Sequence, residues 1–179
     1  IIYAERARVL NGENMRDAII KMMNEVIESQ VDMFVGDDQE TKDWDVAGLS
    51  QSLFEIIPVK LEIPKSEIEH LSKAEFKQLL KEAAVKLYEA KEAEFPEPEH
   101  IRELERIVLL RVIDRKWMDH LDDMEQLKQG IGLMAYGQRD PAVEYKIQGF
   151  EMFNDMIEGI KVETVKTLYH IQVEQKVER

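Results

Sequence analysis

Two pairs of residues have a spacing that could hold metal ions. Glu67 and His70 form one Glu-x-x-His pair, and Glu97 and His100 form the other. Carboxylate-bridged di-metal bundles use such pairs together with a glutamate from each of two further helices, and all these ligands point inward. Both pairs here lie near prolines and among acidic residues, where helices break. We therefore expect them on the solvated surface, and metal analysis of the purified chain tests the alternative of a di-metal enzyme.

A third histidine lies among carboxylates. His120 has Asp119, Asp122 and Asp123 as sequence neighbours. On a helix these residues fall on the polar side, so the pattern predicts a surface imidazole paired with acids rather than a metal ligand.

A glycine motif raises the question of nucleotide binding. Residues 130–135 read Gly-Ile-Gly-Leu-Met-Ala, which matches the dinucleotide fingerprint G-x-G-x-x-G/A. That fingerprint needs a strand before the glycines and a helix directly after them, so that the helix N-terminus holds the pyrophosphate. Here a helix is expected before the glycines, and the next helix begins only at Pro141. The chain also lacks a P-loop, a G-x-S-x-G motif and any cysteine, and we predict no catalytic residue, cofactor or metal in it.

Composition restricts the function classes further. The chain has 179 residues, of which 44% are apolar and 34% charged, with a net charge of −13. An acid excess of this size argues against a general nucleic-acid binder, which needs a basic face. No apolar run approaches the ~20 residues of a membrane span, and no signal peptide is visible, so a cytoplasmic protein is expected.

Periodicity predicts an all-α fold. The chain opens without a Met or a helix cap, within what reads as a helix, so we expect a piece of a longer protein. Asn11-Gly12 stops that helix, and Asn14 begins a second one. A short helix over 46–57 follows, then an extended piece over 59–63. The capping box of Ser72 and Glu75 starts a strong helix that runs to about Glu94.

The last part of the chain predicts an antiparallel helical hairpin. One helix runs from about Glu99 to Gln129, and Gly130 and Gly132 end it. Asp140 as N-cap and Pro141 at the first helical position begin the next helix. Each helix has an apolar stripe that we expect to be buried: Leu110, Ile113, Trp117, Leu121 and Met124 in the first, and Val143, Ile147, Phe150, Phe153, Ile157 and Ile160 in the second.

The tip of this hairpin is apolar. Leu133, Met134 and Tyr136 form, with Ala135, an apolar run in a loop where polar residues are usual. Either Tyr136 folds back onto the hairpin, or the tip contacts another chain.

Specific segments resemble the SecA family of bacterial preprotein translocase ATPases. Residues 112–121 read Val-Ile-Asp-Arg-Lys-Trp-Met-Asp-His-Leu, and residues 124–131 read Met-Glu-Gln-Leu-Lys-Gln-Gly-Ile. The similarity continues at Leu133 and over 135–138, 140–141, 144–146 and 149–153, and residues 2–6 are similar to a stretch of the family's long scaffold helix. Residues 34–99 match only in position and style, like the family's variable helical wing.

The resemblance implies a domain organisation. Residues 1–33 and 100–179 would belong to the helical scaffold, and residues 34–99 would form the wing. The two nucleotide-binding motor domains and the zinc-binding tail of SecA would lie outside this chain. ATP and Mg²⁺ would bind to those motor domains, so the chain itself is expected not to be an enzyme.

The resemblance also implies partners and site residues. The hairpin looks like SecA's two-helix finger, with its tip at 130–140, which enters the cytoplasmic mouth of the SecY channel. Tyr136 would then contact the translocating preprotein, with Leu133 and Met134 beside it, and Gly130, Gly132 and Gly137 would let the tip adjust. The family usually has Arg where this sequence has Met134, which removes a cation and puts a contact to acidic channel loops or lipid headgroups in doubt.

Localisation, self-association and an alternative function remain to be considered. A chain of this kind would be cytoplasmic and peripheral at the inner face of the plasma membrane, with the SecA motor domains as its partners. A scaffold face that normally meets the motor could also drive self-association. The alternative function is a free-standing helical adaptor that binds partner helices, which autonomous binding elsewhere would favour.

Overall fold

The structure is all-helical, as the periodicity predicts. The computed structural model describes residues 2–134 and 140–172, apart from the side chain of Met134. This part of the chain contains no strand. Its elements are α1 (Ile2–Leu10), α2 (Arg16–Phe34), the 3-10 helix η1 (Thr41–Asp43), α3 (Val46–Ile56), α4 (Lys65–Ile68), α5 (Lys73–Ala93), α6 (Pro98–Met134) and α7 (Pro141–His170).

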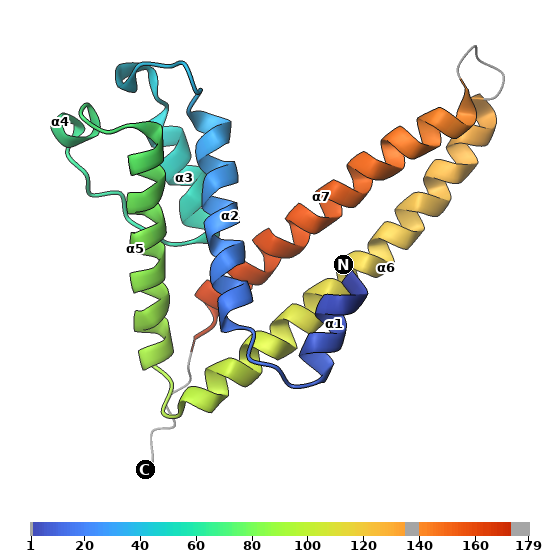
Figure 1. The fold of residues 1–179 in the computed structure, drawn as a ribbon, viewed down its shortest axis with the longest axis horizontal. Coiled ribbons are helices and arrows are strands. Elements are labelled where there is room, and N and C mark those ends of the chain that lie inside the picture. The colour runs from blue at the N-terminus through green and yellow to red at the C-terminus, as the bar shows by residue number, and fades with distance from the viewer. Residues whose placement is uncertain (1, 135–139, 173–179) are drawn as a thin grey trace.

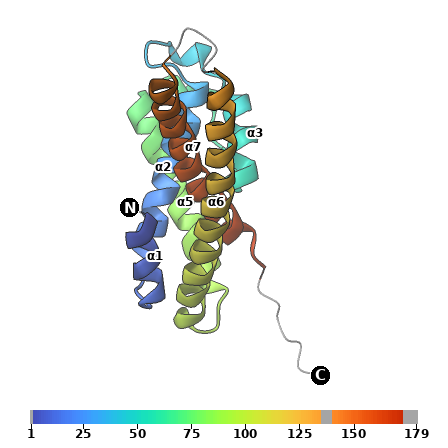
Figure 2. The same ribbon diagram turned by 90° about the vertical axis from the view of Figure 1, so that its right-hand side faces the viewer.

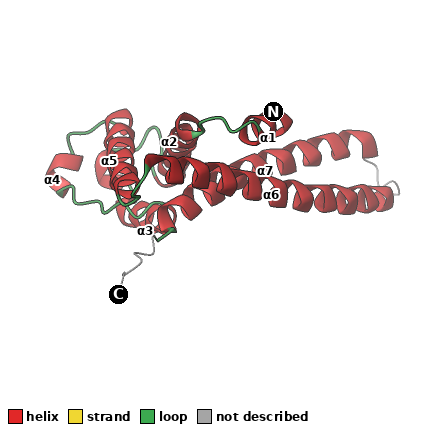
Figure 3. Ribbon diagram, turned by 90° about the horizontal axis from the view of Figure 1, so that it is seen from below, coloured by secondary structure: helices red, strands yellow, loops and turns green. Residues whose placement is uncertain are grey.

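Helices α6 and α7 form a long antiparallel hairpin (Figure 1). At ~1.5 Å per residue they are roughly 55 Å and 45 Å long. Helices α2 and α5 run side by side across the base of the hairpin, with α3 beside them, and α2 and α3 contact α7. Figure 2 shows the hairpin in front of these helices, and Figure 3 shows its outer half projecting beyond them. The hairpin is therefore anchored at one end.

The core lies at this anchored end. Side chains from α2, α3, α5, α6 and α7 form one continuous buried cluster. Its most deeply buried members include Met15, Ile19, Met23, Ile27, Leu49, Leu53, Phe76, Leu80, Tyr88 and Leu109. Burial of a side chain of this size contributes about 1.5–3 kcal/mol, so the base of the hairpin is the stable part of the molecule.

The helix ends follow local signals that the sequence predicts. Gly12 has a φ of +73° after the last residue of α1, and its N–H donates to the carbonyl of Val9, which is a Schellman-type end. Ser72 accepts a hydrogen bond from the backbone N–H of Glu75 at 3.1 Å and so caps α5. Asp140 accepts one from the N–H of Ala142 at 3.0 Å and caps α7. The predicted starts of α5 and α7 are thereby confirmed.

One predicted helix end is wrong. Helix α6 does not stop at Gln129 but continues through Gly130 and Gly132 to Met134. A glycine inside a helix costs only about 1 kcal/mol relative to alanine, so two glycines weaken the last turns without ending them.

None of the described helices has a stretch that is both long enough and apolar enough to cross a bilayer.

Candidate functional site: the hairpin and its base

The predicted tip residues lie only partly within the described structure. Leu133 is in the last turn of α6 with 75% of its surface exposed, and Met134 is the last residue of that helix. Gly130 and Gly132 are helical, and a side chain at either position would meet open space. Tyr136 and Gly137 lie outside the described residues, so the contact role of Tyr136 stays a prediction.

Close packing along the interface between α6 and α7, called the seam below, holds the two hairpin helices together. A Cβ at Gly149 would lie 3.1 Å from the Cε of Met124, so the glycine makes room for that side chain. Nearer the base, Arg115 Nη2 lies 3.0 Å from Glu163 Oε1, which joins α6 to α7 at the surface. The seam therefore combines a close apolar contact with an ion pair, and both hold the antiparallel helices side by side.

The imidazole of His120 is part of this seam. Only 8% of the residue is exposed, so the prediction of a surface histidine is wrong. The ring lies 5.6 Å from that of Trp117 and 5.9 Å from that of Phe153, the latter edge-on. Neighbouring acids in the sequence suggested a polar face, whereas aromatic packing across the seam decides the position.

Much of the predicted apolar stripe is exposed on the outer half of the hairpin. Four residues expected to be buried have about half or more of their surface exposed: Leu121, Val143, Ile147 and Phe150. Each hairpin helix has only one neighbour there, so a stripe wider than the seam remains partly uncovered (Figure 3). Exposed apolar surface of this kind marks contact sites.

At the base, an ion-pair cluster joins α2, α5 and α6. Arg16 donates to both carboxylate oxygens of Glu92, from Nη2 at 2.9 Å and from Nε at 3.1 Å, and Arg102 also donates to Glu92. Burial raises the pKa of the Glu92 carboxyl, but the hydrogen bonds from the two guanidinium groups outweigh it, and the pKa lies below its ordinary value. The cluster thus favours the charged form of Glu92.

Beside this cluster lies a fully buried carboxyl group. Glu105 is 0% exposed, accepts a hydrogen bond from the hydroxyl of Tyr88 at 2.5 Å, and lies 3.0 Å from Arg102 Nε. Burial raises the pKa values of both Glu105 and Tyr88. Tyr169 packs on Tyr88 with ring centroids 5.6 Å apart and donates to the carbonyl of Ala84 at 2.7 Å. This polar core fixes α7 on α5 and α6.

Neither the ion-pair cluster nor the buried carboxyl group is predictable from the sequence alone. Glu105 occupies a helix position that reads as solvent-exposed, and Arg16 and Glu92 are 76 residues apart. Only the pairing of distant helices brings such residues together, and a single sequence carries no signal for it.

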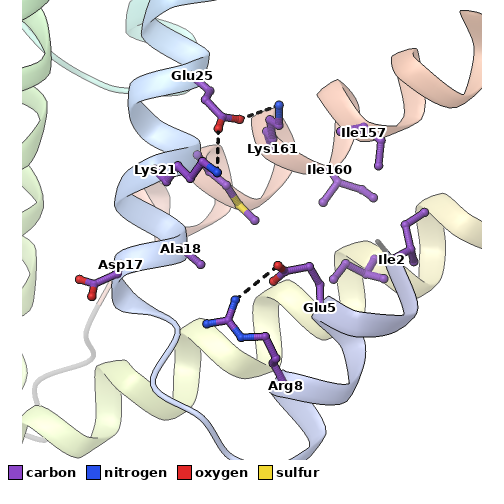
Figure 4. Close-up of a pocket in the computed structure, with 12 residues that line it drawn as sticks. Ile2, Glu5, Arg8, Asp17, Ala18, Lys21, Glu25, Ile157, Ile160 and Lys161 are labelled. Carbon is purple, nitrogen blue, oxygen red and sulfur yellow. Dashed lines mark hydrogen bonds and ion pairs between the residues drawn. The ribbon is translucent and has the colours of Figure 1, made fainter.

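A groove of about 520 Å³ opens where α1, α2, α6 and α7 meet (Figure 4). Isoleucines from α1, α6 and α7 line it, and charged residues of α1, α2 and α7 surround them. Glu25 on α2 lies 2.6 Å from Lys161 on α7, and Arg8 on α1 lies 3.4 Å from Glu5. The Glu25–Lys161 pair is a direct polar link between α2 and the hairpin helix α7.

Comparison with known proteins decides the family. The sequence model described as SecA Wing and Scaffold domain matches residues 1–172. This chain belongs to the SecA family. The resemblance to this family is thereby confirmed, and the match extends over residues 1–172.

Individual relatives give the same result. The chain is 60% identical over 180 residues to the protein translocase subunit SecA of Lachnoclostridium phytofermentans, covering 100% of this chain and 21% of that protein. It is 44% identical to SecA 1 of Alkaliphilus metalliredigens, covering 100% of this chain and 20% of the relative, and 44% identical to SecA of Clostridium novyi, covering 100% and 21%. The chain therefore spans about a fifth of the length of these curated relatives.

In this SecA segment the Glu-x-x-His pairs lie at the surface. Glu67, His70, Glu97 and His100 are all exposed, and His100 Nε2 lies 3.6 Å from Glu97 Oε2. Within residues 2–134 and 140–172, no three His, Asp or Glu side chains are arranged so that they could hold a metal ion.

Proposed function

We propose that this chain is a non-catalytic part of a SecA protein-export motor. Its hairpin acts as a two-helix finger that contacts the SecY channel and the translocating preprotein through Tyr136, Leu133 and Met134. ATP and Mg²⁺ bind to motor domains outside this chain, and the finger follows the movement that hydrolysis produces there. The membership of the SecA family carries this proposal.

The geometry of the hairpin supports a mechanical role. A packed pair of helices with 37 and 30 residues is stiff along its length, and its outer half projects freely from the base (Figure 1). A displacement at the base is therefore transferred to the tip.

The contacts at the base support the same role. Glu25 and Lys161 join α2 to α7, and Arg6 Nε lies 2.8 Å from Asp114 Oδ1 and joins α1 to α6. The helices α1 and α2 thus contact both members of the hairpin, and a rotation of these scaffold helices would tilt it.

The chemistry of the tip suits a substrate without a fixed sequence. Leu133 offers exposed apolar surface, and a tyrosine combines an aromatic ring with a hydroxyl that hydrogen-bonds to any backbone. Such a grip is generic, as transport of many different polypeptides requires. The motor domains, the SecY complex and a position at the inner face of the plasma membrane complete the proposal.

A cysteine crosslink tests the contact of the tip. The chain contains no Cys, so Tyr136→Cys in a cysteine-free intact parent protein introduces a single thiol. A preprotein with one cysteine is stalled in the channel, and disulfide formation is measured. The control is Arg111→Cys, because residue 111 is exposed on α6 near the base of the hairpin. A thiol there is accessible to the crosslinking reaction, whereas a thiol at the buried position 120 would fail to react because of its burial alone.

We expect crosslinks from position 136 and none from position 111. A protein that still transports preprotein but forms no crosslink from position 136 would contradict the finger role, and the hairpin would then serve as scaffold only.

A further inference from the structure

The connection between α1 and α2, residues 10–14, forms an exposed joint (Figure 1). Every residue of this joint is exposed, whereas Val9 before it and Met15 after it are buried, with 6% and 0% of their surface exposed. The chain is thus anchored on both sides of a short segment that solvent surrounds. Water and hydroxide therefore reach the backbone and the side chains of the joint.

An Asn-Gly pair lies within this joint. Asn11 is followed by Gly12, and the sequence has no second pair of this kind. Gly12 has a φ of +73°, and within the described part of the chain no heavy atom beyond its chain neighbours would lie within 4 Å of a Cβ built on it. Because glycine has no Cβ, its own backbone nitrogen is unhindered. The nitrogen of Gly12 is therefore a sterically open nucleophile next to the side-chain amide of Asn11.

Two backbone hydrogen bonds close the joint. The N–H of Gly12 donates to the carbonyl of Val9 at 3.0 Å, and that of Glu13 donates to the carbonyl of Arg8 at 3.2 Å. The first of these bonds must open before the nitrogen of Gly12 can attack a carbonyl carbon. Opening the joint displaces exposed side chains and leaves the buried anchors in place, and exposed helix ends open at a low cost in free energy.

We propose that Asn11 is a site of spontaneous deamidation. The backbone nitrogen of Gly12 attacks Cγ of Asn11, so that an N–Cγ bond forms while the Cγ–Nδ2 bond breaks, and Nδ2 leaves as ammonia with the proton of the Gly12 N–H. Water then adds to one of the two carbonyl carbons of the cyclic imide and opens the ring to aspartate or to isoaspartate. No atom is oxidised or reduced, and water is the co-reactant. The joint gains one negative charge, and in isoaspartate one additional backbone carbon.

The three other asparagines of the sequence lack this combination of features. Asn24 and Asn154 lie within α2 and α7, where the backbone N–H groups are hydrogen-bonded along the helix. Asn14 is not followed by a glycine, and its Oδ1 accepts a hydrogen bond from the N–H of Arg16 at 2.9 Å. These three residues are internal controls for the reactivity of the Asn-Gly pair.

Deamidation should loosen the end of α1. A carboxylate at position 11 lies at the C-terminus of the helix, where negative charge is unfavourable, and two residues from Glu13, which already pairs with Arg8 at 2.8 Å. In isoaspartate the longer backbone also displaces the two hydrogen bonds that close the joint. We expect the amide hydrogens of residues 2–10 to exchange about two- to fivefold faster in Asn11→Asp than in the wild type. The inference does not depend on the proposed role in protein export.

Peptide mapping of the aged protein by mass spectrometry tests the proposal. The folded chain, and the same chain unfolded in guanidinium chloride, are kept in mildly alkaline buffer, and aspartate and isoaspartate are measured at each asparagine over time. We expect conversion of Asn11 in the folded chain at no less than about a tenth of its rate in the unfolded chain, because the joint opens at a low cost. Asn14, Asn24 and Asn154 should remain amides in the folded chain over the same period.

Two variants identify the reacting groups. Asn11→Gln keeps an amide at this position but has to close a larger ring, so conversion should fall at least about tenfold. Gly12→Ala places a Cβ beside the attacking nitrogen, and conversion should fall there too. Alanine is strained at the left-handed φ of this position and loosens the joint, which by itself would speed the reaction. Slower conversion in Gly12→Ala therefore assigns the attack to the nitrogen of residue 12.

Three results would overturn the proposal. These are an absence of conversion at Asn11 in the folded chain while the unfolded chain reacts, conversion of the other three asparagines at the same rate, and an unchanged or higher rate in Gly12→Ala. Unchanged hydrogen exchange in Asn11→Asp would overturn the predicted loosening of α1.

Discussion

The hydroxyl of Tyr88 donates a 2.5 Å hydrogen bond to the buried carboxylate of Glu105 and thereby joins α5 to α6. Both groups lie in the core at the base of the hairpin, where water cannot replace either partner. We expect Tyr88→Phe to lower the free energy of unfolding by about 1–3 kcal/mol, because it leaves a buried acceptor with one partner fewer. Urea denaturation measures this loss.

The matched control for that variant is Tyr3→Phe. Tyr3 is 72% exposed, and its hydroxyl has no hydrogen bond with a described residue. Its removal should change stability by less than about 0.5 kcal/mol. Equal stability of the Tyr88→Phe variant and the wild type would show that the hydrogen bond makes no net contribution to the free energy of unfolding.

The polar core also shows where prediction from sequence fails. Ser72, Asp140 and Gly12 act through the backbone within a few residues of their own positions, so their types alone predict the helix ends correctly. The position of Glu105 depends instead on Tyr88 and Arg102, and the latter is held in turn by Glu92. A charged residue in a helix is assigned to the surface unless its distant partners are known.

The hairpin illustrates the same limit for apolar residues. The stripe of α7 predicts a buried face, and Ile160 at the base is indeed buried, whereas Phe150 in the outer half is 67% exposed. The periodicity is correct, but it does not state how many helices will cover the face. His120 is the converse case, since its packing on Phe153 is determined by the partner helix and not by the acids beside it.

Replacement of Glu105 should change the pH dependence of stability. Burial raises the pKa of this carboxyl above its ordinary value of 4.5. The folded protein therefore binds the proton more tightly than the unfolded chain does. The contribution of Glu105 to stability is fully present at pH values below the pKa that this residue has in the unfolded chain. It is lost as the pH rises through the higher pKa that the residue has in the folded protein. Glu105→Gln lacks this titration, so its stability relative to the wild type should improve as the pH rises from about 4 to about 7.

Urea denaturation of both proteins at several pH values measures this difference. A variant that loses stability relative to the wild type over the same range would show that Arg102, rather than burial, dominates the environment of Glu105.

Replacement of Glu92 should give the opposite dependence. The hydrogen bonds from Arg16 and Arg102 hold the pKa of Glu92 below the ordinary value despite burial. The contribution of Glu92 to stability is therefore present at pH values above its pKa in the unfolded chain, and it is lost as the pH falls through its pKa in the folded protein. The side chains of Arg16 and Glu92 are 31% and 21% exposed, so we expect Glu92→Gln to cost about 1–2 kcal/mol near neutral pH. The difference from the wild type should shrink toward zero in acid.

A matched control exists for this prediction as well. Glu40 lies 2.8 Å from Lys42, but the two side chains are 73% and 71% exposed. Glu40→Gln should leave stability unchanged at every pH, because solvent screens exposed pairs. A loss for Glu92→Gln that does not diminish in acid would assign the effect to packing and not to charge.

The two glycines in the last turns of α6 allow a test of whether the hairpin needs flexibility near its tip. Gly130 and Gly132 are helical with open space around them, so alanine fits at both positions and should stabilise the last turns of α6 by about 1 kcal/mol each. If these glycines let the tip adjust to its substrate, the double variant Gly130→Ala and Gly132→Ala should unfold at a higher urea concentration and yet transport preprotein more slowly in the intact parent protein.

Gly159→Ala is the control, because its Cβ would make an ordinary contact of 3.7 Å with Lys116 in the inner half of the hairpin. It should give a comparable gain in stability without a change in transport. Wild-type transport by the stabilised double variant would exclude a hinge at these two positions and leave the hairpin as a rigid lever up to Met134.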